Sequence, residues 1–139
     1  GNLMASARRT LYGAINRNGD QFEHQDFLRL FDFPSARATS EGRTSNTVPQ
    51  QFLFLMNSPF MAARAKALAA RLQGSAAQDE ARIALAYRLL YSRSPTVEES
   101  ELGTSFLRQP VDVSQPGVLS PLEQFAQVLL SSNELIFVE

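Results

Sequence analysis

The chain has 139 residues, 44% of them apolar and 9% aromatic, which predicts one globular domain with a core of its own. Its net charge of −1 provides no basic surface for nucleic acid, and the lack of cysteine excludes disulfides, thiolate catalysis, Cys-ligated zinc and covalently attached haem. No run approaches the roughly 18 apolar residues of a membrane span, so we expect none.

The N-terminal third is irregular and rich in aromatic residues. Residues 8–17 fit either a helix or a short strand, because Leu11 and Ile15 lie four apart while the apolar residues also alternate. The next segment contains Phe22, Phe27, Phe31 and Phe33. Residues 35–47 have no apolar period, and a loop of about thirteen residues in a compact domain is long enough to suggest a function.

Residues 49–74 predict two helices in succession. Residues 49–56 are apolar on every side, so we expect a central helix there. Ser58 is the expected N-cap of the next helix, Pro59 its first residue and Gly74 its left-handed stop. The expected buried stripe of this helix is Met61, Ala65, Leu68 and Leu72.

Three capping boxes, each a Ser or Thr followed three residues later by Glu or Gln, divide the rest of the chain. They begin at Ser75, Thr96 and Ser120, and each predicts the start of a helix. The residues expected to face inward are Ile83, Ala86, Tyr87 and Leu90, then Leu102 and Phe106, then Leu122, Phe125, Ala126 and Leu129. The apolar run 135–138 is expected to dock back onto the bundle.

These elements predict a mainly α fold, a single domain over residues 1–139 with about five helices. Residues 1–47 form its irregular segment and loop, with one short strand at most, and residues 48–139 form its helical core. Gly1 is typical of a scar left by tag removal, so we expect this chain to be a fragment of a larger parent protein.

Four charged residues of the N-terminal third form the candidate ligand site: Arg8, Arg9, Asp32 and Arg43. Two interpretations remain open. In the first, the guanidinium groups hold an anionic or sugar ligand in a pocket. In the second, an Arg–Asp pair with bidentate geometry fixes the irregular segment onto the helices.

The remaining chemical groups predict no catalytic residue, no metal site and no cofactor. His24 is the only histidine, and two neighbouring carboxylates do not complete a usual zinc site. The sequence has no Gly-x-Ser-x-Gly elbow and no glycine-rich phosphate loop. The side chains of Phe22, Phe27 and Phe31 are core candidates, and any that stay exposed form the candidate interaction surface.

Five blocks of sequence follow one another in a recognisable order: residues 8–12, 30–34, 47–60, 84–99 and 128–139. Together they resemble the C-terminal part of a planctomycete-type domain of unknown function, the DUF1553 family. The resemblance implies a large exported parent protein, in which this domain comes after a cytochrome-c-like region and a further uncharacterised domain. It implies no reaction, cofactor site or catalytic residue.

Two classes of function fit these observations. The first is a non-catalytic helical module that docks against upstream domains of its exported parent or against another exported protein. The second is a domain that binds or hydrolyses polysaccharide, or binds an anion, with Arg9, Asp32 and Arg43 at its site. An exposed apolar patch favours the first, and a concave pocket that collects the charges favours the second. A third idea, electron transfer with the cytochrome-like region, rests on family context alone.

Overall fold

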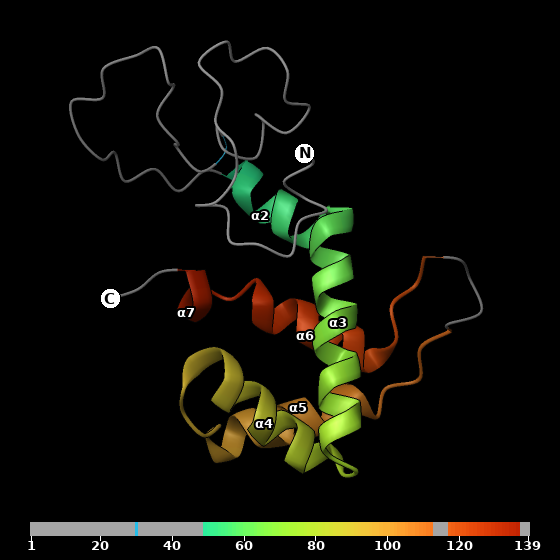
Figure 1. The fold of residues 1–139 in the computed structure, drawn as a ribbon, viewed down its shortest axis with the longest axis vertical. Helices are drawn as coiled ribbons and strands as arrows, with labels where there is room; N and C mark the ends of the chain where they lie inside the picture. Colours follow the sequence, from blue (N-terminus) through green and yellow to red (C-terminus); the bar gives the residue numbers. More distant parts are fainter. Residues whose placement is uncertain (1–29, 31–48, 113–116, 137–139) are drawn as a thin grey trace, which may run out of the picture. The chain divides into compact units, whose positions relative to one another are not determined.

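The computed structural model describes Leu30 and residues 49–112 and 117–136. Within these ranges the chain is helical and contains no strand, which confirms the predicted mainly α class. The helices, labelled as in Figure 1, are α2 (Pro49–Asn57), α3 (Pro59–Ser75), α4 (Asp79–Tyr91), α5 (Val97–Leu107), α6 (Pro121–Leu130) and α7 (Asn133–Ile136). Residues 8–17, where the sequence allows a helix or a strand, lie outside the described residues.

The chain divides into two compact units, Gly1–Leu53 and Phe54–Glu139. Nearly all described residues belong to the second unit, which contains the whole of α3, α4, α5, α6 and α7. The prediction of a single domain over residues 1–139, with its helical core beginning at residue 48, stays a prediction.

The second unit is built around the longest helix, α3, and α6, which runs across it (Figure 1). These two helices form the most extensive contact between any two of the described elements. α4 and α5 pack on each other beside the C-terminal end of α3, and α5 also contacts α6. The core therefore lies where α3, α4, α5 and α6 meet.

The main core cluster takes its side chains from α3, α4 and α6. Its buried members are Leu72, Ile83, Ala86, Tyr87, Phe125 and Leu129. Leu72 and Ile83 are the largest side chains among the fully buried residues of the described structure. The predicted inner faces of α4 and α6 are therefore confirmed, with Leu90 and Leu122 at their partly buried edges.

A second cluster consists of alanines at the contact between α3 and α6. Ala65 and Ala69, four residues apart on α3, pack against Ala126 of α6, and all three are buried. The partly buried Leu68 and Leu122 pack against both clusters. Small side chains at this contact let the two helix backbones approach closely.

Local capping fixes three helix starts as the sequence predicts. Ser58 accepts a hydrogen bond from the backbone N–H of Met61 (3.2 Å), with a proline in the first turn of α3. Thr96 and Ser120 each form a complete capping box, with Glu99 and Glu123 respectively, at the starts of α5 and α6.

The predicted boundary between α3 and α4 is wrong. α3 continues through Gly74 and Ser75, and the backbone N–H of Ala76 still donates to the carbonyl oxygen of Leu72 (3.0 Å). Gly74 therefore does not adopt the left-handed conformation expected of a stop. Because Ser75 belongs to the last turn of α3, it cannot cap the next helix.

The N-terminus of α4 is stabilised by Arg82 in place of the predicted capping box. Gln78 occupies the N-cap position and makes no side-chain capping bond. Arg82 donates from Nε to the carbonyl oxygen of Ala76 (2.9 Å) and from Nη1 to Oδ1 of Asp79 (2.8 Å). This arginine connects the loop to the first turn of α4, a role that the Ser–Gln spacing does not reveal.

Two predictions of buried helix faces are wrong at particular residues. In α2, Leu55 is buried but Phe52 and Met56 are exposed, so this helix is not central. In α5, Phe106 packs against the core as predicted. Leu102, however, is 71% exposed, and the adjacent Gly103 is buried. The face of α5 that meets the core is set by the space that a glycine leaves for its neighbours.

Gly103→Val is expected to destabilise the fold by about 1–3 kcal/mol through overpacking. A Cβ atom at Gly103 would lie 3.0 Å from Cδ1 of Ile83 and 3.4 Å from Cε2 of Phe125. Gly74→Val is the matched control, because a Cβ there meets nothing within 4 Å. Urea denaturation should show the larger loss for Gly103→Val. Equal losses would mean that the packing around Gly103 tolerates a side chain.

None of the helices described in the structure is both long enough and apolar enough to cross a membrane.

Candidate functional site

The predicted ligand-site residues, Arg8, Arg9, Asp32 and Arg43, lie outside the described residues. The predicted interaction residues Phe22, Phe27 and Phe31 lie there too. Both assignments therefore remain predictions.

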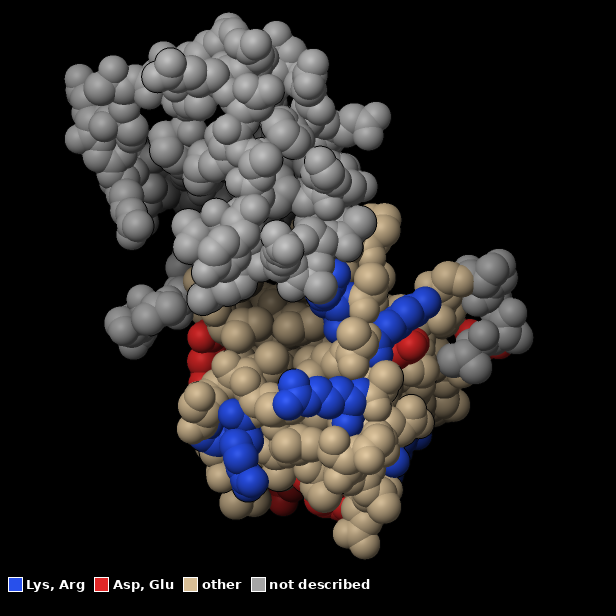
Figure 2. Space-filling view, viewed as in Figure 1, with Lys and Arg blue, Asp and Glu red and all other residues tan. Residues whose placement is uncertain are grey.

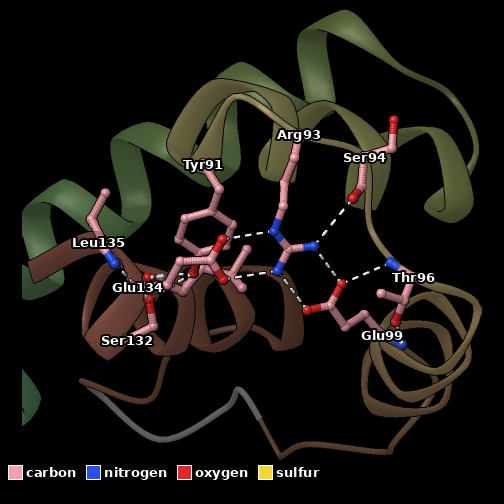
Figure 3. Close-up of polar contacts among 9 residues, drawn as sticks. Tyr91, Arg93, Ser94, Thr96, Glu99, Ser132, Glu134 and Leu135 are labelled. Atoms are coloured by element: carbon pink, nitrogen blue, oxygen red, sulfur yellow. Dashed lines mark hydrogen bonds and ion pairs between the residues drawn. The ribbon is translucent and has the colours of Figure 1, made fainter. Parts of the chain in front are cut away.

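The most developed polar cluster of the described residues surrounds Arg93, just after the end of α4 (Figure 3). Ser92 ends that helix in the left-handed conformation, with φ 57°. A non-glycine residue rarely adopts this conformation, and here it turns the chain out of α4. Pro95 and the cap residue Thr96 then lead into α5, so Arg93 lies at the junction between the two helices.

The first partner of Arg93 is Glu99, in the first turn of α5. The two side chains form a bidentate pair, with Nη1 2.8 Å from Oε2 and Nη2 2.7 Å from Oε1. Oε2 of Glu99 also accepts the backbone N–H of Thr96 (2.7 Å) in the capping box. One carboxylate thus caps α5 and holds the arginine, a geometry that gives strong charge-assisted bonds.

The second partner of Arg93 is Glu134 of α7. Nε lies 2.7 Å from Oε1, and Nη2 lies 2.8 Å from Oε2 (Figure 3). Arg93 and Glu134 are separated by 41 positions in the sequence. The arginine therefore links the α4–α5 junction to the last described helix.

All five N–H donors of Arg93 are occupied within the chain. Nε bonds Glu134, Nη2 bonds both carboxylates, and Nη1 bonds Glu99 and, at 3.2 Å, the carbonyl oxygen of Ser94 (Figure 3). A guanidinium has no further N–H to offer. In this conformation Arg93 therefore cross-links the α4–α5 junction, α5 and α7, and it has no N–H donor left for an anionic ligand.

Two tyrosines of α4 lie against the arginine. The guanidinium carbon of Arg93 is 5.1 Å from the ring centroid of Tyr87 and 5.6 Å from that of Tyr91, within cation–π range. The two rings meet edge to face, with centroids 5.2 Å apart. The hydroxyl of Tyr91 donates to the carbonyl oxygen of Leu129 (2.9 Å) and lies 2.8 Å from Oγ of Ser132.

The charges of this cluster shift the pKa values of its members. Arg93 lowers the pKa of Glu99 to about 2 and also lowers the pKa of Glu134, chiefly by hydrogen bonding to each carboxylate. The two carboxylates raise the pKa of Arg93. Burial raises the pKa values of Tyr87 and Tyr91. Both acids are therefore held ionised, which suits an ion pair and not a proton donor.

Glu99→Gln should lower the melting temperature at pH 6, and its effect should shrink as the solution is acidified. The pKa of Glu99 is depressed from 4.5 to about 2, so its contribution to stability is full above pH 4.5. That contribution is lost as the pH falls towards 2. Melting curves of both proteins between pH 6 and 2.5 should show the difference narrowing. A constant difference over this range would contradict the role assigned to the Arg93–Glu99 pair.

Sequence reasoning did not identify this cluster. In the sequence, Glu98, Glu99 and Glu101 fit the negatively charged start of a helix, which the helix dipole favours. The capping box at Thr96 does fix the position of the Glu99 carboxylate, and Arg93 lies three residues before that cap. That spacing was the available indication of the first pair. Nothing in the sequence indicates the second pair, with Glu134.

The described residues offer little for other chemistry. No group of three or more His, Cys, Asp or Glu side chains within them could hold a metal ion. A shallow, open depression beside α5 is lined by hydroxyl and charged groups of Glu80, Ser100, Glu101, Thr104, Ser105 and Arg108. Nη2 of Arg108 lies 3.7 Å from Oε1 of Glu80 there, between two exposed side chains.

Comparison with known protein families gives a match. The family model described as a protein of unknown function (DUF1553) matches residues 2–107. No curated protein and no solved structure matches the chain. The matched residues include Arg93 and Glu99, whereas α6 and Glu134 lie beyond them. The match covers well over half of the sequence, and the chain accordingly belongs to the DUF1553 family.

Proposed function

We propose that the C-terminal unit is a non-catalytic helical module. In this proposal it docks, through exposed apolar side chains, against upstream domains of a large exported parent protein or against another exported protein. The observation that carries the proposal is the exposure of four apolar residues of this unit: Met56 (62%), Val97 (71%), Leu102 (71%) and Val128 (61%). Removing such groups from water favours association.

The polar groups of the unit support the same interpretation. Its densest polar cluster is saturated by bonds within the chain, since all five donors of Arg93 are occupied. No buried side-chain nitrogen or oxygen of the described residues lacks a hydrogen-bond partner. Binding energy for a partner is therefore more available from the apolar surface than from the polar groups. The one face drawn in Figure 2 likewise has broad uncharged areas between scattered charged side chains.

Among the described residues of the unit, we group the four most exposed large apolar ones into two pairs, which we name the α2–α6 patch (Met56 and Val128) and the α5 patch (Val97 and Leu102). In the first, Nε2 of Gln127 donates to the backbone oxygen of Met56 (2.5 Å), which places the end of α2 beside Gln127, the residue that precedes Val128. In the second, both residues lie on one helix. Each patch can be altered without touching the core.

The test is a calorimetric titration of the chain with the separately produced upstream portion of its parent protein. We expect binding. In the patch that contacts the partner, replacing both residues with Ser should weaken that binding by about tenfold or more. The double variant of the other patch is the matched control and should bind normally. Because all four positions are exposed, each substitution should change stability by only about 0.5 kcal/mol, which melting curves would check.

Unchanged binding by both double variants would contradict docking through these patches. No binding by a folded wild-type chain would contradict the module function itself. In that case anionic and neutral polysaccharides become the ligands to screen, with Arg9, Asp32 and Arg43 as the residues to vary.

A further inference from the structure

The short helix α7 is held to the unit by polar contacts and by the partly buried side chains of Leu135 and Ile136. It has four residues, none of them buried, and it packs on α4. Glu134 bonds Arg93, and Ser132, just before α7, bonds the hydroxyl of Tyr91 (2.8 Å). The side chain of Glu134 is 45% exposed, so solvent and salt reach this ion pair. The attachment of α7 therefore involves no fully buried side chain of its own.

The groups that α7 would leave behind each have a second partner in the body of the unit. Without Glu134, Arg93 keeps the bidentate pair with Glu99. Without Ser132, the Tyr91 hydroxyl keeps the carbonyl oxygen of Leu129 (2.9 Å). When α7 detaches, the guanidinium of Arg93 and the hydroxyl of Tyr91 therefore each keep a hydrogen-bond partner. A polar group left without a partner is what usually makes the free energy of such a local opening large.

Departure of α7 would also free one particular edge of Arg93. Its Nε and one N–H of Nη2 would lose their acceptor, and these two donors match the two oxygens of a carboxylate. Glu134 itself shows that this edge accommodates a second carboxylate beside Glu99 (Figure 3). The rings of Tyr87 and Tyr91 lie within cation–π distance of the same guanidinium.

We propose that α7 is a displaceable strap, and that the Nε/Nη2 edge of Arg93 beneath it is a binding site for the carboxylate of an acidic peptide. Glu134 is the internal occupant of this site. An acidic segment of a partner takes its place when the strap opens. The inference deepens the proposed docking function and rests on it, since it names the chemistry of one contact with the partner.

The first measurement is amide hydrogen exchange of the full chain. The backbone N–H groups of Leu135 and Ile136, which bond the carbonyl oxygen of Ser132, should exchange faster than those of the core helices. Glu134→Gln should accelerate them by about threefold, and the core amides should be unaffected. Glu101→Gln is the matched control and should change neither. Exchange of the α7 amides only at the rate of global unfolding would overturn the strap.

The second measurement follows the Nε–Hε NMR signal of Arg93 in the full-length Glu134→Gln protein. The probe is a capped hexapeptide with the sequence of residues 131–136. We expect a saturable shift of this signal, about threefold weaker binding when the peptide carries Gln for Glu, and weaker binding to the wild-type chain, whose own Glu134 competes. Equal binding of the Glu and Gln peptides would overturn the carboxylate site.

The two proposals fail in distinguishable ways. If the hexapeptide does not bind while the upstream portion of the parent still does, the site on Arg93 is wrong and the docking function stands. If the upstream portion does not bind the wild-type chain, the docking function is wrong, whatever the peptide does.

Discussion

Ending the chain after Gln109 is expected to abolish the cooperative unfolding of the C-terminal unit. This truncation keeps every residue matched by the family model but removes α6 and α7. Urea or thermal unfolding should then lose its sigmoidal transition, and the binding of a hydrophobic dye should increase.

The physical reason is that α6 completes the core. Phe125 and Leu129 pack with Leu72 and Ile83 in the main cluster, and Ala126 closes the alanine contact with α3. Without α6, the inner faces of α3 and α4 would lie open to water in a fragment too small to replace the lost burial. Arg93 would also lose its bonds to Glu134.

The control for this experiment is a chain that ends at Ile136, which retains α6 and α7. It should unfold cooperatively, near the melting temperature of the full chain. A sharp transition in the shorter protein would show that residues 54–109 fold without α6, and it would contradict the central position given to the α3–α6 contact.

Leu72→Ala should cost about 2–5 kcal/mol of unfolding free energy. The side chain has no exposed surface and contributes to the main core cluster from the last turns of α3. Its removal forfeits the transfer free energy of the lost methyl groups. It also leaves a cavity, because helices on several sides hold the walls apart.

Leu102→Ala is the matched control, since it makes the same chemical change at a side chain that is 71% exposed. It should change stability by only about 0.5 kcal/mol. Urea denaturation of the two variants compares them directly. A larger loss for Leu102→Ala than for Leu72→Ala would reverse the assignment of buried and exposed faces.

Features encoded by a few neighbouring residues could be predicted from the sequence. Ser58, Thr96 and Ser120 begin helices as expected, because each cap needs only its own hydroxyl and a backbone N–H one turn ahead. The buried faces of α4 and α6 could be predicted for a similar reason. One apolar stripe at helical spacing allows a single inward orientation.

Features that depend on tertiary packing could not be predicted from the sequence. In α5, Phe106 packs against the core as expected, but Leu102 is exposed and Gly103 is buried instead, with Ile83 and Phe125 close beside it. At Ser75 the sequence has a capping-box pattern, but α3 continues through this residue, so no helix begins there. In each case a partner distant in the sequence or the wider packing decided between two locally acceptable choices.

The candidate site likewise combines features that neighbouring residues encode with features that depend on distant residues. The capping box at Thr96 includes Glu99, but nothing local pairs Glu99 with Arg93, and Glu134 has no local indication at all. An ion pair between residues 41 positions apart requires the bundle to form first. The predicted Arg and Asp site of the N-terminal third lies outside the described residues and stays a prediction.

The contact between α3 and α6 also has a consequence during synthesis on the ribosome. Leu72 is made more than fifty residues before Leu129, its partner in the core. Because translation adds roughly 5–20 residues per second, several seconds pass between the synthesis of α3 and that of α6. During that interval the part of α3 that contacts α6, including Ala65 and Ala69, has no native partner, so nascent chains stalled before α6 should be those that chaperones bind most readily.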